Sequence, residues 1–230
     1  MKITYIFHSG FLAETKNFYY LFDYYKGALP PLDTGKPIMV FASHAHSDHY
    51  NPEIFEILKS MRMKNITAIL SKEIPEKKYP KGVTCIKVTF HQTYGLPCKT
   101  TLKTFLSTDE GVAFLLQCPE GTIYHAGDLN DWVWEGETVA YNKQMTASYR
   151  HEIDLLKDTA IDVAFIPLDP RQEKDYANGM LYFLKKVKVS KIYPMHYWEQ
   201  PDIINKFLSE HPEYQDIIMI TEQNDPLANI

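Results

Sequence analysis

Short apolar runs alternate with turn residues along the first half of the chain. Runs rich in Ile, Val, Leu, Phe and Tyr that are bounded by Gly, Pro, Asn or Asp are typical of β-strands. Asn51 is a good N-cap and Pro52 a good first helical residue, so one early helix is predicted from about residue 51 to 59. Strands are predicted at residues 3–7, 18–25, 38–41, 68–71, 83–90, 102–107, 112–117 and 122–125.

The second half of the sequence alternates between helical and strand-like spacing. Helices are predicted at residues 139–158, 176–187 and 203–210, with strands at 163–167, 191–194 and 217–220. This mixture predicts an α/β (α+β) chain with two mixed β-sheets covered by helices. The longest Pro/Gly-rich stretch is too short for a domain linker, so residues 1–230 are expected to form a single domain.

Composition limits the binding partners and the cellular location that can be expected for the protein. The chain has 230 residues, 45% of them hydrophobic, and a net charge of -5 without charged blocks, which argues against binding nucleic acid or an anionic membrane. Cys85, Cys98 and Cys118 stand singly, as reduced thiols do. With no apolar leader and no long apolar run, we expect a cytoplasmic protein without a membrane span. The oligomeric state is left open.

The segment after the predicted strand 38–41 concentrates metal-binding side chains. It reads Ser-His-Ala-His-Ser-Asp-His, and its donors are His44, His46, Asp48 and His49. Packing alone does not explain three imidazoles and a carboxylate at the end of a strand. Neutral imidazoles and a carboxylate are ligands that a zinc-like divalent ion prefers. The motif therefore predicts part of a metal site.

Three further candidate ligands follow predicted strands elsewhere in the chain. His91, Asp128 and His196 each stand where an apolar run ends, and Gly127 allows a tight turn directly before the aspartate. Catalytic and ligand-binding residues are common at strand ends in open α/β sheets, because the strand fixes the backbone while the loop exposes the side chain. These three residues could complete the site.

Taken together, these motifs resemble the metallo-β-lactamase fold superfamily. The resemblance rests on Asp23 after a strand, residues 44–49, His91, Gly127-Asp128 and His196, in that order. It is closest to the branch of small metal-dependent hydrolases that includes the L-ascorbate-6-phosphate lactonases. Three segments carry that closer resemblance: His8-Ser9-Gly10, residues 124–128 and residues 194–197. The resemblance implies a four-layer αββα sandwich of two mixed sheets flanked by helices.

The resemblance also implies a dinuclear site and a hydrolytic activity. Asp48 and Asp128 would be catalytic, and a hydroxide bridging two divalent ions would cleave an ester, lactone, amide or phosphodiester bond in a small molecule. Zinc is the expected metal, although manganese and iron also fit these ligands. The implied ligands are His44, His46 and His91 for one ion, Asp48, His49 and His196 for the other, and Asp128 as the bridge.

Five other residues are candidates for supporting the metal ligands or for contacting a substrate. Asp23, by resemblance, orients the metal-binding loop without binding metal. His8 either bonds to a ligand, lines the pocket or is a structural histidine, and His125 is more simply a supporting or core residue than a ligand. Trp132 forms a substrate wall or packs on the sheet edge. Arg171 clamps a phosphate or carboxylate, or pairs with Asp169 or Glu173.

Rival functions remain at this point. A dinuclear phosphodiesterase or nuclease is the enzymatic alternative, and the acidic net charge argues against a nucleic-acid substrate. A di-iron redox protein is less consistent with a first site made of histidines alone. A non-catalytic metal-binding module is also less consistent, because structural zinc sites are closed and four-coordinate.

Overall fold

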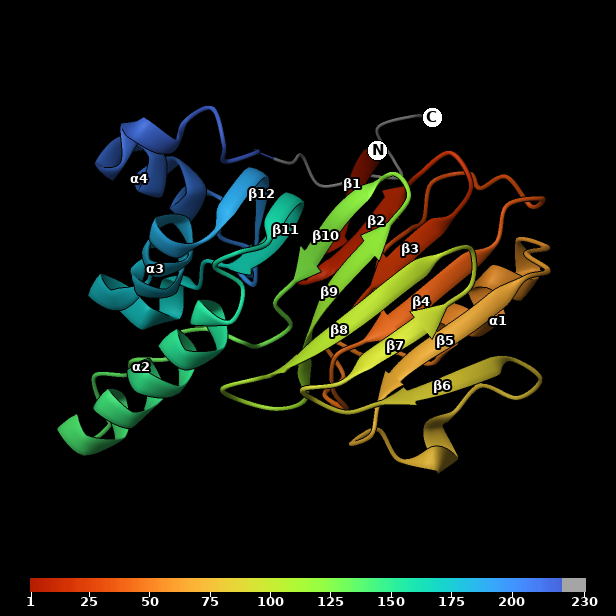
Figure 1. The fold of residues 1–230 in the computed structure, drawn as a ribbon, viewed down its shortest axis with the longest axis horizontal. Helices are drawn as coiled ribbons and strands as arrows, with labels where there is room; N and C mark the ends of the chain where they lie inside the picture. Colours follow the sequence, from red (N-terminus) through yellow and green to blue (C-terminus); the bar gives the residue numbers. More distant parts are fainter. Residues whose placement is uncertain (221–230) are drawn as a thin grey trace. The chain divides into compact units, whose positions relative to one another are not determined.

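The computed structural model describes residues 1–220, which fall into two compact units, residues 1–89 and residues 90–220. Figure 1 shows a six-stranded sheet in each unit. Both sheets are mixed, as the sequence predicts. The expectation of one domain for the whole chain stays a prediction.

The first unit orders its strands β1 to β6 as they occur in the sequence (Figure 1). The first two pairings are antiparallel and the remaining three are parallel. A single α-helix, α1 (Glu53–Ser60), follows the fourth strand. The strands are β1 (Lys2–Phe7), β2 (Gly10–Glu14), β3 (Tyr19–Phe22), β4 (Ile38–Ala42), β5 (Ile66–Ser71) and β6 (Thr84–Val88).

The core of this unit lies between α1 and one face of the sheet. Side chains of a strand alternate between faces, so Ile38, Val40 and Ala42 of β4 pack in one cluster with Ile54 and Phe55 of the helix. All five residues of β4 are buried, which holds the backbone of the following loop firmly in place. Because β3 and β4 are parallel neighbours, residues 23 and 43–49 leave the sheet at the same edge.

The second unit orders its strands β12-β11-β10-β9-β8-β7 (Figure 1). Strands β10, β11 and β12 are parallel, and the other pairings are antiparallel. The strands are β7 (Thr93–Leu96), β8 (Thr100–Leu106), β9 (Val112–Cys118), β10 (Gly121–His125), β11 (Ala160–Pro167) and β12 (Lys188–Met195). The parallel arrangement brings residues that follow β10, β11 and β12 to one edge of this sheet.

Three α-helices accompany the second sheet: α2 (Val139–Asp154), α3 (Asn178–Lys186) and α4 (Asp202–Glu210). Helix α2 packs on α3, and α3 packs on β11. The rings of Tyr124 on β10 and Phe183 on α3 stack with centroids 5.5 Å apart. Thr138 caps α2 by accepting the amide N–H of Tyr141 at 3.1 Å. Helix packing thus fixes the side of the sheet that carries β10 and β11.

Most elements agree with the sequence predictions, and three differ. Strands β2 and β7 are absent from the predictions, and the predicted strand 217–220 is only an isolated bridge between Ile192 and Ile218. The predicted helix start is nearly right, because the Asn51 side chain accepts the Glu53 amide N–H at 3.0 Å. Among residues 1–220, no helix combines the length and apolar character needed to cross a membrane.

Candidate metal centre

Asp23 connects the loop after β3 with the histidine-rich loop after β4. Its carboxylate is fully buried. One oxygen, Oδ1, accepts the amide N–H of Ser43 at 2.8 Å. The other, Oδ2, accepts the Ser43 hydroxyl at 2.6 Å and contacts Nδ1 of His49 at 2.8 Å. Since a carboxylate is an acceptor, Nδ1 of His49 carries the proton, and Nε2 keeps the lone pair that a metal requires.

The same carboxylate sets the protonation of His44 through Ser43. A hydroxyl has one proton, and that of Ser43 is donated to Asp23. Nδ1 of His44, 2.9 Å from the Ser43 oxygen, is therefore the donor in this contact, which leaves the lone pair on Nε2. That Nε2 lies 3.1 Å from Nδ1 of His46, an exposed residue of the same loop.

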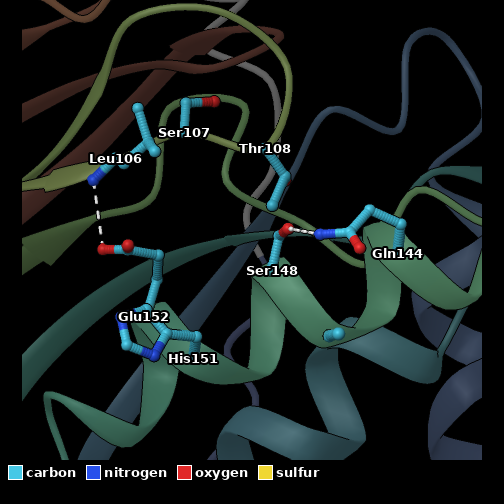
Figure 2. A pocket seen from close by; sticks show the side chains of 8 residues that line it. Leu106, Ser107, Thr108, Gln144, Ser148, His151 and Glu152 are labelled. Carbon is cyan, nitrogen blue, oxygen red and sulfur yellow. Dashed lines mark hydrogen bonds between the residues drawn. The ribbon is translucent and has the colours of Figure 1, made fainter.

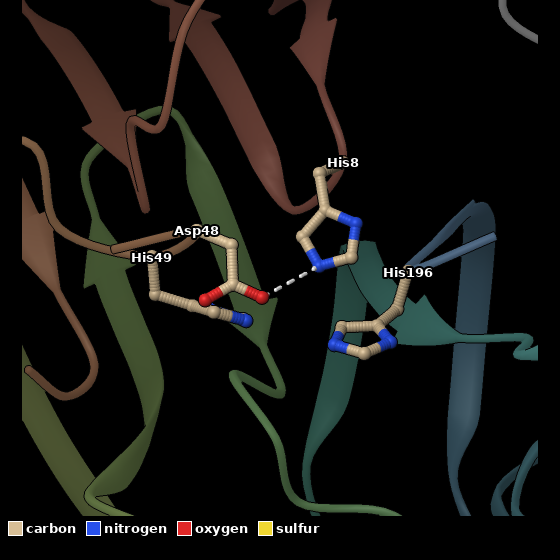
Figure 3. A group of neighbouring side chains, drawn as sticks. All are labelled: His8, Asp48, His49 and His196. Carbon is tan, nitrogen blue, oxygen red and sulfur yellow. Dashed lines mark ion pairs between the residues drawn. The ribbon is translucent and has the colours of Figure 1, made fainter. Parts of the chain in front are cut away.

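His8 joins this group from the turn between β1 and β2. Figure 3 shows its ring directed at the carboxylate of Asp48, with Nε2 and Oδ2 3.5 Å apart. Its ring also meets the edge of His49 with centroids 5.5 Å apart. Ligand atoms of His8, Asp48 and His49 all lie within 4.8 Å of one another. The structure thus places His8 among the candidate donors.

The second unit brings Asp128, Asp169 and His196 together at the ends of β10, β11 and β12. Nε2 of His196 lies 3.4 Å from Oδ1 of Asp128. Nδ1 of His196 lies 2.8 Å from Oδ2 of Asp169, which is completely buried. The two ring nitrogens of His196 therefore face different carboxylates, and Nδ1 makes the shorter contact.

Arg171 also binds the carboxylate of Asp169. Its Nε is 3.0 Å from both oxygens, and Nη2 is 2.6 Å from Oδ2. Burial raises the pKa of Asp169, but hydrogen bonds from His196 and Arg171 outweigh it and hold the pKa at about 2. Of the two interpretations of Arg171, the structure shows the pairing with Asp169.

Trp132 and His125 shape the turn that carries Asp128. The indole Nε1–H of Trp132 donates to the backbone carbonyl of Asp128 at 2.8 Å, and its ring lies 5.4 Å from that of His196. Trp132 is buried, so it packs behind the turn. Nδ1 of His125 accepts the amide N–H of Gly127 at 3.1 Å. Both residues fix the backbone around Asp128, and no group of three or more candidate donors among residues 1–220 includes His125.

Several of these residues have backbone conformations that L-amino acids rarely adopt. His8, Asp23, His91 and His196 have φ angles of 58°, 41°, 54° and 62°, in the left-handed region. A single residue there costs about 1–3 kcal/mol unless its surroundings compensate, and such residues gather at functional sites. Four of the nine non-glycine residues with positive φ among residues 1–220 are thus residues that the sequence singles out for chemistry.

His91 is placed differently from the other predicted ligands. Its Nε2 lies 3.0 and 2.9 Å from the two oxygens of Glu152 on α2, and its side chain is 42% exposed. Glu152 is buried and also accepts the amide N–H of Leu106 at 3.1 Å. Among residues 1–220, no group of three or more candidate donors includes His91 or His46.

A cavity of about 280 Å³ lies beside this pair, between the end of β8 and helix α2. Figure 2 shows the carboxylate of Glu152 reaching Leu106, with Ser148 and Gln144 bonded to each other along the helix. Its lining is Leu106, Ser107, Thr108, Gln144, Ala147, Ser148, His151 and Glu152. His91 and Glu152 therefore fasten the start of the second sheet to α2.

Sequence reasoning did not single out Glu152 or Asp169 as functional residues. Asp169 had a usable signal, because it follows the buried strand β11 at the edge that carries Asp128 and His196. Glu152 had none, since a glutamate within a helix is ordinarily on the surface.

The residues present fit divalent metal ions. Two nitrogens bound to one zinc at about 2.0–2.1 Å lie roughly 3.3 Å apart in a tetrahedron. The donor atoms of His44 and His46 are 3.1 Å apart, and those of His196 and Asp128 are 3.4 Å apart. Carboxylates also fix the Nδ1–H of His49 and His196, which is the support that metal-binding imidazoles commonly have.

Comparison with known proteins agrees with this fold. A UPF0173 metal-dependent hydrolase of Nanoarchaeum equitans is 29% identical over 215 residues, covering 88% of this chain and 86% of that protein. Igni18, a metallo hydrolase of Ignicoccus hospitalis, superposes with a TM-score of 0.68 at 19% identity, over 97% of this chain and 95% of that one.

A protein described with a different activity also matches over part of its length. CmlA of Streptomyces venezuelae, a di-iron β-hydroxylase, matches with a TM-score of 0.52 at 13% identity, over 96% of this chain and 47% of that one. Fold alone therefore does not decide the activity. The profile of the β-lactamase superfamily domain matches residues 2–138, more than half of the sequence. The chain thus has the metallo-β-lactamase-like fold and belongs to the β-lactamase superfamily.

Proposed function

We propose that this protein is a metal-dependent hydrolase that holds two divalent ions through His44, His46, Asp48, His49, Asp128 and His196. One observation carries the proposal. The buried carboxylate of Asp23 holds Nδ1–H of His49 directly and that of His44 through Ser43, so both imidazoles keep Nε2 for a metal. Burying a carboxylate completely costs folding free energy, so a buried carboxylate that orients two ligands is better explained by metal binding than by folding alone. The name of the Nanoarchaeum relative supports the same class.

Two bound divalent ions, zinc above all, would supply a water molecule of lowered pKa and polarise the bond to be cleaved. The residues of the chain would hold the ions in position and transfer protons. Asp48 would accept a proton at Oδ2 and share it with Nε2 of His8, 3.5 Å away. Asp128 would provide the negative charge common to both ions, on a turn that Trp132 and Gly127 fix.

The substrate we propose is a small molecule with an ester, lactone, amide or phosphodiester bond. The net charge of -5 favours a small substrate over a nucleic acid.

Metal removal and restoration test the proposal. Purified protein would be stripped with a chelator, reloaded with zinc, manganese or iron, and assayed on a phosphodiester, a lactone, a thioester and an amide. We expect activity on one bond class that vanishes on stripping and returns on reloading. Activity that survives complete stripping would contradict the proposal. Oxygen consumption with the iron-loaded protein, without hydrolysis, would favour the di-iron alternative.

His91 is left out of the proposed ligands because its Nε2 is bonded to Glu152. We expect His91→Gln to keep the metal content of the wild type and to lose about 1 kcal/mol of unfolding free energy, since an amide replaces one hydrogen bond to a charged group imperfectly. Mass-spectrometric metal analysis and urea unfolding measure the two effects. Loss of one metal equivalent would return His91 to the ligand set.

A further inference from the structure

We propose that Asp169 and Arg171 form a support that positions His196 and fixes its Nδ1–H tautomer, so that Nε2 is kept for metal binding. The inference rests on the proposed function for its purpose. Its geometry lies wholly within residues 90–220.

The three side chains make a continuous chain of charge-assisted hydrogen bonds. Nδ1 of His196 contacts Oδ2 of Asp169 at 2.8 Å, and Arg171 grips both oxygens of that carboxylate through Nε and Nη2. The amide N–H of Arg171 also donates to Oδ1 at 2.9 Å. A carboxylate held at this many points has little freedom to rotate, so it fixes the direction from which it accepts the imidazole proton.

Aromatic rings confine the two ends of this chain. The imidazole of His196 contacts the rings of both Trp132 and Trp198, with centroid distances of 5.4 and 5.8 Å. The guanidinium carbon of Arg171 lies 5.0 Å from the ring centre of Trp198 and 5.8 Å from that of Trp134. Stacking on indoles holds the planar guanidinium against Asp169.

The local backbone gives a reason for this support. His196 has a φ of 62° and follows directly after β12, so its conformation is strained and must be held by neighbours. Asp169 follows β11, the parallel neighbour of β12. The side chain of Arg171 is 47% exposed, yet its guanidinium group contacts the carboxylate of Asp169, which is completely buried. Arg171 therefore acts through Asp169 and His196.

A tautomer measurement on the metal-free protein tests the inference without any activity assay. Long-range ¹H–¹⁵N spectra at about pH 8, well above the usual imidazole pKa of about 6.5, would show which ring nitrogen of His196 is protonated. The His196→Gln variant assigns the signals. We expect protonated Nδ1 in the wild type and in the matched control Asp162→Asn, which changes the same charge on an exposed part of β11. In Asp169→Asn we expect the Nδ1–H form to lose its dominance.

Zinc affinity, measured by competition with a chelator, provides the second readout. Asp169→Asn should bind zinc about 10–100-fold more weakly, as loss of a partner of a metal-binding imidazole typically causes. Arg171→Gln keeps the carboxylate and should retain Nδ1–H while still weakening zinc binding. If Asp169→Asn does not fold, the Arg171→Gln variant tests the inference in its place. Wild-type zinc affinity in Arg171→Gln would overturn the role of Arg171.

The outcomes separate this inference from the proposed function. An unchanged tautomer of His196 and unchanged zinc affinity in Asp169→Asn would overturn the inference while leaving the metal centre intact. A wild type with protonated Nδ1 that depends on Asp169, but with no zinc binding, would support the positioning role and reject the metal centre.

Discussion

Replacing Asp128 by asparagine is expected to lower turnover by more than about 100-fold and to remove most of the bound metal. Loss of a residue that only orients a ligand costs about 10–100-fold, and Asp128 is proposed to touch both ions itself. The amide has nearly the same shape but no charge, so the loss would report the missing negative charge beside Nε2 of His196. Metal content and steady-state rates measure the two effects.

Asp131→Asn is the matched control for this variant. Asp131 is buried three positions further along and accepts the hydroxyl of Thr146 at 2.6 Å, a bond that an amide oxygen can replace. Burial raises the pKa of Asp131, so its environment already disfavours the charged form. We expect this variant to keep its metal and its turnover. Full turnover in Asp128→Asn would contradict the two-metal assignment.

Asp23→Asn is expected to weaken metal binding by about 10–100-fold without binding metal itself. An amide offers one acceptor oxygen and an NH₂ group in place of two acceptor oxygens. It cannot accept from Ser43 at both contacts and from His49 as well. His49 would then lose its fixed Nδ1–H, and the hydroxyl contact that orients His44 would be disturbed. Isothermal titration of the metal-free protein with zinc measures the loss.

The exposed Asp33 provides a control with the same change of charge in the same unit. Asp33→Asn should bind zinc as the wild type does. The backbone at position 23 has a φ of 41°, a region that asparagine tolerates better than most residues, so strain alone should not unfold Asp23→Asn. Equal zinc affinity of the two variants would show that Asp23 does not orient the ligands.

Strand β4 shows how a continuous apolar run could be predicted from the sequence. Strand β4 is an uninterrupted apolar run because it is buried on both faces, and the predicted strand at residues 38–41 lies within it. Strands β2 and β7 were missed because they are short and carry Gly10 and Gly95, which weaken a strand pattern. The predicted strand at residues 217–220 has the right composition, but it makes only one bridge to Ile192.

The candidate site could be predicted only where ligands follow strands. Residues 44–49, Asp128 and His196 were singled out in this way as candidate ligands, and the structure places Asp48 beside His8 and Asp128 beside His196. Partners that come from another element are harder to recognise, even where a strand end provides a signal, as β11 does for Asp169. Glu152 lies within α2, 61 positions from His91, and Asp169 lies 27 positions from His196. Such pairs depend on helix packing and on the order of parallel strands, which periodicity alone does not specify.

Metal content per chain is the measurement that tests the central claim most directly. Purified protein would be analysed by inductively coupled plasma mass spectrometry, as isolated and after reconstitution with zinc and with manganese. The proposed centre predicts close to two ions per chain, as in two-metal hydrolases. Less than one ion per chain after reconstitution with either metal would contradict it.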